Sequence, residues 1–140
     1  MPTIFTRIIT GDLPGRFVWR DDHCVAFLSI NPLQPGHTLV VPRAEVDHWI
    51  DLSAEANAHL MRVAHSIGAA QMDAFAPARI GLIIAGLEVP HVHLHVVPIQ
   101  RESDLSFANA DLAPATDAMD RAADELRAAL RARDANGVSD

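Results

Sequence analysis

The stretch His91–Pro98 constrains this chain more than any other, because three histidines alternate in it with branched apolar residues. Strict alternation of this kind is typical of a β-strand. Side chains two residues apart on a strand share a face, so we expect His91, His93 and His95 in one row, with the Val and Leu side chains opposite. Pro98 should end this strand, since proline cannot donate a hydrogen bond to the sheet.

A purely structural role for this row is disfavoured, because burying three polar rings costs free energy and adds nothing to packing. Two kinds of chemistry remain open. A neutral imidazole can attack phosphorus while neighbouring rings donate hydrogen bonds to its oxygens and to the leaving group. Alternatively, His-x-His on a strand can offer two ligands to zinc. With few cysteines and no carboxylate inside the motif, we favour the first reading and predict no metal and no cofactor.

Size and composition limit the remaining possibilities. A chain of 140 residues, 49% of them hydrophobic, is long enough for one domain with a real core. A single cysteine, Cys24, leaves no internal disulfide and suits a reducing compartment. The net charge of −7 argues against nucleic acid or an anionic membrane as partner. With no transmembrane run and no signal-peptide pattern in Met1–Thr10, we expect a soluble, cytoplasmic protein.

The apolar periodicity predicts five strands and two main helices, which suggests an α+β fold with an antiparallel sheet. A short helix is expected near the start and ends at Gly11. Pro114 should stand in the first turn of the last helix, which continues to about Leu130. The predicted strands are 17–20, 24–30, 37–41, 80–84 and 91–97, the first main helix is 53–75, the segment 101–113 is a loop, and 134–140 is frayed.

Four further histidines lie outside the row, in predicted turns or on predicted helix surfaces. Histidine is mostly found partly exposed, so we interpret these four as solvated or locally hydrogen-bonded residues without a catalytic role. They are His23, His48, His59 and His65.

Beyond the alternation itself, the sequence His91-Val-His-Leu-His-Val-Val97 resembles the signature of the histidine-triad (HIT) family. The block Phe27–Pro42, which contains Asn-Pro-Leu-Gln-Pro-Gly-His-Thr, and the block Thr3–Pro14 are similar to two further blocks of that family. The resemblance covers about residues 3–100 without large gaps. We therefore expect a single HIT-like domain over 1–140, in which 101–140 forms a loop plus a C-terminal helix.

The resemblance implies a homodimer with one continuous sheet across both subunits, and a small-molecule nucleotide as substrate. It implies cleavage at the α-phosphate of nucleoside phosphoramidates or (di)nucleoside polyphosphates through a nucleotidyl-histidine intermediate. By the same resemblance, His93 is the nucleophile and the backbone carbonyl of His91 orients its ring. His95 contacts the phosphate and assists the leaving group, and His37 is the fourth histidine of the site.

The substrate contacts follow from the resemblance in the same way. Ser29 stands where many members carry an acid that binds the ribose, and Glu88 and Val89 lie in the segment before the triad, where Glu88 would repel a phosphate unless it points away. Thr3 and Thr6 replace a Cys-x-x-Cys that holds structural zinc in some members, so we predict no zinc there. The nucleoside should lie against Ile4, Phe5, Ile8, Phe27, Leu28 and Ile30.

Two alternatives to this enzyme stay open. One is a nucleotide-binding module with little or no catalysis, which the altered residues Ser29 and Glu88 favour. The other is a zinc enzyme that uses the histidines of the row as metal ligands.

Overall fold

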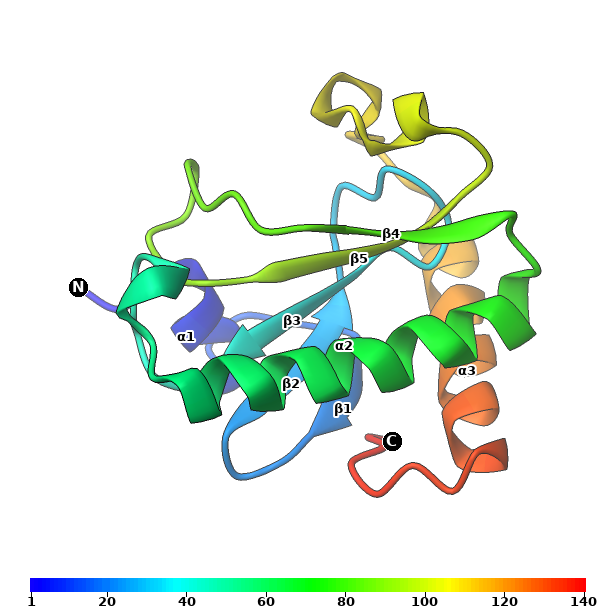
Figure 1. Cartoon of the computed structure of the whole chain (residues 1–140). Helices are drawn as coiled ribbons and strands as arrows, with labels where there is room; N and C mark the ends of the chain where they lie inside the picture. The colour runs from blue at the N-terminus through cyan, green and yellow to red at the C-terminus, as the bar shows by residue number, and fades with distance from the viewer.

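The computed structural model describes residues 1–140 and contains one antiparallel sheet of five strands in the order β1-β2-β3-β5-β4 (Figure 1). The predicted α+β fold is confirmed. The strands are β1 Phe17–Arg20, β2 Cys24–Leu28, β3 Thr38–Pro42, β4 Arg79–Ile83 and β5 Leu94–Ile99. The helices are α1 Ile4–Ile9, α2 Ala54–Phe75 and α3 Thr116–Ala132, with short 3-10 turns η1 Trp49–Asp51, η2 Glu102–Leu105 and η3 Phe107–Asn109.

The two faces of the sheet carry different cores. The larger core joins α2 and α3 to side chains such as Ala26, Val40 and Leu94. The smaller one joins α1 to Phe27 and Leu39 on the other face. Alternation along β2 and β3 sends neighbouring residues to opposite sides, which divides each strand between the two cores.

Helix α2 begins and ends where local chemistry directs it. The Ser53 hydroxyl accepts a hydrogen bond from the Ala56 amide at 3.1 Å, which caps the first turn. The helix stops at Ala76, whose φ of +47° is left-handed, just before Pro77. Its buried Leu60, Val63 and Ile67 lie on the stripe that the periodicity predicts. None of the protein's helices has both the length and the apolar character needed for a membrane span.

The histidine stretch is only partly a strand. Strand β5 begins at Leu94, so His91 and His93 precede it, and the expectation of a strand from residue 91 is corrected. The Val92 amide there donates to the carbonyl of Val46 at 2.8 Å, outside the sheet ladder. The predicted end at Pro98 is also wrong, because Pro98 lies inside β5 opposite Ile80. Strand β3 pairs with β5 only as far as Val96, so at Pro98 the strand has a partner on one side only, β4.

The two ends of the last segment also differ from the sequence expectation. Helix α3 starts at Thr116, so Pro114 precedes the helix rather than standing in its first turn. The segment 134–140, predicted to fray, runs along β1: the Arg20 amide donates to Gly137 at 2.7 Å, and the Ser139 amide to Val18 at 3.1 Å. These bonds cover the β1 edge of the sheet, so β4 is the edge left unpaired.

Candidate active site

Four histidines meet on the face of the sheet that α1 partly covers. His91, His93 and His95 come from the segment that enters β5, and His37 lies just before β3. All four are at most 9% exposed, and the rings of His93 and His95 lie 4.8 Å apart between centroids. The row that the alternation predicts is therefore present, although only His95 belongs to the strand itself.

The ring of His93 is fixed by the backbone. Its Nδ1 lies 2.7 Å from the carbonyl oxygen of His91, and a carbonyl oxygen can only accept. Nδ1 of a neutral His93 must therefore carry the proton, which leaves the lone pair on Nε2. This is the tautomer that a nitrogen nucleophile needs.

The ring of His95 is fixed through His37. The amide of Leu33 donates to Nδ1 of His37 at 3.0 Å, so the proton of a neutral His37 sits on Nε2. That Nε2 lies 2.9 Å from Nδ1 of His95 and donates to it. The proton of His95 is then on Nε2, where it can be donated to a bound molecule. A nitrogen with a free lone pair and a hydrogen-bond donor thus come from adjacent rings of the row.

His91 has no free nitrogen. Its Nε2 donates to the carbonyl of Pro42 at 2.7 Å, and its Nδ1 accepts from the Thr3 hydroxyl at 2.7 Å. The same Thr3 oxygen accepts from the amide of Thr6 and caps α1. The ring therefore holds the carbonyl that orients His93. Thr3 and Thr6 offer hydroxyls rather than thiolates, so this corner does not fit a structural zinc ion.

These bonds also bear on the zinc reading of the triad. Both ring nitrogens of His91 and His37 are engaged, and so is Nδ1 of His93 and of His95. Two nitrogens remain, Nε2 of His93 and of His95. A zinc site normally takes at least three protein ligands, so this hydrogen-bond pattern favours metal-free chemistry over zinc ligation by the row.

Burial keeps the site rings neutral. It lowers the pKa of His37 to about 3, with the neighbouring His95 and His93 adding to the shift, and that of His95 to about 4. Burial also lowers the pKa of His93, opposed by the carbonyl of His91 and by the charge of Glu88. At neutral pH, His93 therefore keeps its lone pair.

Most of the predicted apolar contacts gather beside the rings. Phe5, Ile8 and Phe27 form one buried cluster against which Val89 packs, and the Phe5 ring lies 4.9 Å from that of His93. Leu28 does not join them, because the neighbour of Phe27 on β2 points into the larger core. The substrate contact expected of Leu28 is therefore corrected.

The exposed members of the predicted set lie on the rim. Ile4 is 44% exposed and Ile30 62%, so both have surface to offer a ligand. The hydroxyl of Ser29 accepts from the amide of Asn31 at 3.3 Å. Glu88 is exposed, and its charge raises the pKa of His93 against the larger effect of burial. Substrate contacts by these residues stay predictions.

One neighbour of the site, Phe107, is not predicted by the sequence pattern. The ring of Phe107, in η3, lies 5.2 Å from that of His95 and is 49% exposed. Its loop is tied down where Asn31 Nδ2 donates to the carbonyl of Asp111 at 3.1 Å. The segment 101–113 therefore borders the site. A lone aromatic residue in a polar stretch was the one available signal, and it is weak.

Comparison with known proteins agrees with this picture. The model of the HIT domain matches residues 10–103. Protein hit of Bacillus subtilis is 32% identical over 106 residues, 72% of this chain and 73% of that protein. Adenylylsulfatase HINT3 of Arabidopsis thaliana is 26% identical over 133 residues, 91% of this chain and 67% of that one. A zinc-bound histidine triad family protein from Mycobacterium smegmatis, 29% identical, has a TM-score of 0.81, with 94% of each chain covered.

A row of histidines on a five-stranded antiparallel sheet, matched in both sequence and fold, defines a histidine-triad protein. The chain belongs to the HIT family, a group of nucleotide-binding hydrolases and transferases. The resemblance read from the three sequence blocks is confirmed.

Proposed function

We propose that this protein is a metal-independent nucleotidyl hydrolase or transferase that acts at the α-phosphate of nucleoside phosphoramidates or (di)nucleoside polyphosphates. The observation that carries the proposal is the pair of fixed tautomers. Nε2 of His93 has a free lone pair because Nδ1 donates to His91, and Nε2 of the adjacent His95 carries a proton.

The reaction then runs in two displacements. Nε2 of His93 attacks the α-phosphorus, an N–P bond forms, and the P–O or P–N bond to the leaving group breaks. The N–H at Nε2 of His95 donates a hydrogen bond to the leaving oxygen or nitrogen, which takes up a proton from solvent as it departs. In the second step, water attacks phosphorus and releases a proton to solvent, the N–P bond breaks, and a nucleoside monophosphate leaves. An alcohol or amine in place of water gives transfer.

The nucleoside is assigned to the apolar cluster of Phe5, Ile8 and Phe27 with Val89 and the rim residues Ile4 and Ile30, where a base can stack on aromatic edges. Ser29 is the candidate partner of the ribose hydroxyls. The Arabidopsis relative named an adenylylsulfatase makes adenylyl sulfate a further substrate to include, since it too is cleaved at an α-phosphate.

The dimer belongs to the same proposal. Strand β4 is the bare edge of the sheet, and beside it Leu82, Met61 and Met72 are 40–50% exposed. These residues belong to an apolar groove between α2 and β4. Two β4 edges paired about a twofold axis would join the sheets and cover those side chains. Sedimentation at micromolar concentration should give about twice the 15.2 kDa chain mass, and a stable monomer would contradict the dimer.

The decisive experiment traps the intermediate. The protein is mixed with adenosine 5′-phosphoramidate, diadenosine polyphosphate or adenylyl sulfate, quenched in base within the first turnover, and its intact mass measured. We expect a gain of one adenylyl group on His93, absent from His93→Ala. Full turnover by a folded His93→Ala protein would contradict the proposal.

A nucleotide-binding module with little catalysis is the second candidate, and Glu88 is the observation that favours it. An exposed carboxylate near His93 opposes an anionic phosphate there. Calorimetric binding of adenosine monophosphate without turnover of the whole panel would establish this alternative. If Glu88 alone suppresses catalysis, Glu88→Gln should restore turnover.

A further inference from the structure

A second cluster of potential ligands lies on the other side of the sheet from the histidine row. It combines Asp21, in the turn between β1 and β2, and Cys24, the first residue of β2, with His59 of α2. Cys24 belongs to the larger core, whereas the triad lies beside the smaller one. Nothing in the proposed reaction uses these three residues. From the sequence alone, His59 is predicted to be an ordinary surface histidine.

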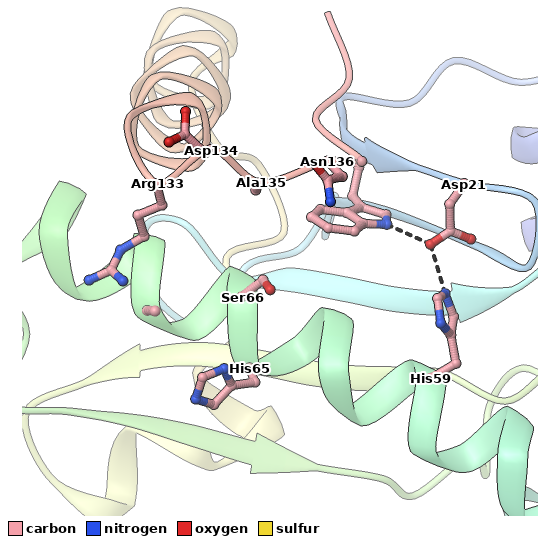
Figure 2. Close-up of a pocket in the computed structure, with 11 residues that line it drawn as sticks. Asp21, His59, His65, Ser66, Arg133, Asp134, Ala135 and Asn136 are labelled. Carbon is pink, nitrogen blue, oxygen red and sulfur yellow. Dashed lines mark hydrogen bonds and ion pairs between the residues drawn. The ribbon is translucent and has the colours of Figure 1, made fainter.

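The three side chains point toward one another. Nε2 of His59 lies 2.7 Å from Oδ2 of Asp21, and Sγ of Cys24 lies 3.6 Å from the same oxygen. All three donor atoms fall within 4.8 Å of one another. Figure 2 shows Asp21 turned toward His59. The indole Nε1 of Trp19 also donates to Oδ2 of Asp21. We propose that Asp21, Cys24 and His59 form a zinc site, separate from the histidine row.

The donor set suits zinc. One thiolate, one imidazole and one carboxylate are the three ligand types that this ion takes in proteins. With bonds of about 2.0–2.3 Å, tetrahedral ligand atoms stand about 3.3–3.6 Å apart. The distance between Cys24 and Asp21 already has that value. His59 would have to withdraw by about 0.6 Å from Asp21, and its side chain is 29% exposed and so has space on the solvent side.

The carboxylate is held ready by its neighbours. Oδ1 of Asp21 accepts from the amides of His23 and Cys24, both at 2.8 Å, and Oδ2 accepts from Trp19 Nε1 at 2.8 Å. A carboxylate has about four lone-pair directions, so these N–H groups fill three. His59 and the thiol share the one that remains. Partners of this kind around a ligand usually orient a metal site.

The charges balance when zinc is bound. Burial, together with the nearby charge of Asp21, raises the pKa of the Cys24 thiol, so without a cation the thiol is neutral. Zinc binding would release that proton to solvent and leave one thiolate and one carboxylate against two positive charges. His59 binds as the neutral ring, with its proton on Nδ1. The site is then neutral overall, which lowers the cost of holding it at the edge of the core.

A cavity gives access to the site. Asp21 and His59 line an open cavity of about 580 Å³, together with Trp19, with Ser66 and Ala69 of α2, and with the last segment at Arg133–Gly137 (Figure 2). Gly137 lies against the indole of Trp19, where any Cβ would collide. The bonds of this segment to β1 therefore complete the wall. Water or a small ligand can reach a fourth coordination position from this cavity.

The test uses the full-length protein, stripped of metal with a chelator and titrated with Zn²⁺ alone. Trp19 donates to Asp21, so its fluorescence in a Trp49→Phe background should respond to the ion. We expect one equivalent to bind, with affinity lowered more than about 100-fold in His59→Gln and in Cys24→Ser, beyond the usual effect of an outer partner. Co²⁺ should give a thiolate-to-metal absorption band that Cys24→Ser lacks.

His65→Gln is the matched control, because His65 lies on the same helix and lines the same cavity but is not one of the three ligands. It should bind Zn²⁺ as the parent does, and so should His93→Ala. Circular dichroism checks that each variant folds; if Cys24→Ser does not, His59→Gln decides, because His59 lies outside the buried core. Absence of saturable binding, binding that survives in His59→Gln, or binding that His93→Ala abolishes would each overturn the proposal.

Discussion

The histidine row and the Asp21 cluster both contain histidines, but the partners of those rings differ. In the row, His91 and His93 donate to neutral backbone carbonyls and His95 is tied to another imidazole. In the cluster, His59 lies against a carboxylate and next to a thiol. A carbonyl fixes a tautomer without adding charge, whereas a carboxylate and a thiol together attract a cation.

The two proposals give different functions to the two sides of the sheet. Rings that are buried among themselves stay neutral, and Nε2 of His93 keeps an open lone pair, which the proposed reaction uses. A ring beside an anion is suited to share a metal ion with it. Four experiments test this division, starting with the largest expected effect.

Removal of the nucleophile should separate the two sites. His93→Ala should lower kcat for adenosine phosphoramidate by at least about 10⁴-fold, because no other group in the site offers a free lone pair in the same place. His59→Gln, on the other side of the sheet, should leave kcat unchanged. Steady-state kinetics of both folded variants checks this. Equal losses in the two variants would show that the sites act together.

The pH dependence of stability should come from the row. The pKa values of His37 and His95, about 3 and 4, lie below their unfolded value, so below about pH 6.5 the unfolded chain binds protons that the native protein does not. The free energy of unfolding should therefore fall as pH falls, by about 1.4 kcal/mol per pH unit for each histidine.

Urea unfolding at pH 7, 6 and 5 measures this slope, and a His37→Gln protein should lose part of it. Asp21 differs, because N–H donors from Trp19, Cys24 and His23 outweigh its burial and hold its pKa well below the usual range. Its contribution is present above about pH 4 and disappears only at lower pH. If the pH dependence of the free energy of unfolding is the same in His37→Gln as in the parent, groups other than His37 cause it.

In the proposed reaction His37 is a positioning residue, because its ring holds Nδ1 of His95. His37→Ala should lower kcat about 10- to 100-fold with little change in KM, because the proton of His95 is no longer fixed on Nε2. p-Nitrophenolate leaves without being protonated. For a substrate with this leaving group, kcat of the His37→Ala variant should therefore fall much less. An equal loss for both leaving groups would mean that His37 supports the fold only.

The smallest effect is expected at Thr3. Thr3→Val keeps the shape but removes both the bond to His91 and the cap of α1, which should cost about 1–2 kcal/mol of stability and a few-fold in kcat. Thr10→Val, at the exposed end of the same helix, is the control. Thermal unfolding and steady-state kinetics compare the two variants. Equal losses of stability and kcat in both would show that Thr3 does not support the site.

Much of the fold could be predicted from local patterns. The alternation in His91–Val97, the periodicity of α2 and the cap at Ser53 depend on residues close in the chain, and their elements are present within a few residues of the expected bounds. The family follows from the three blocks that match it. These features need only neighbouring residues to be recognised.

The tertiary structure decided what local patterns do not contain. The tautomer of His95 depends on the amide of Leu33 and the ring of His37, 62 and 58 residues away. Leu28 points away from the predicted substrate contacts because the two faces of β2 pack into different cores. Phe107 borders the site because its loop is hydrogen-bonded to Asn31. Asp21 and His59, 38 residues apart, meet only after α2 packs on the sheet. Partners that are distant in the chain set the chemistry of each ring, so the amino-acid order identified the histidines and the packing determined their protons.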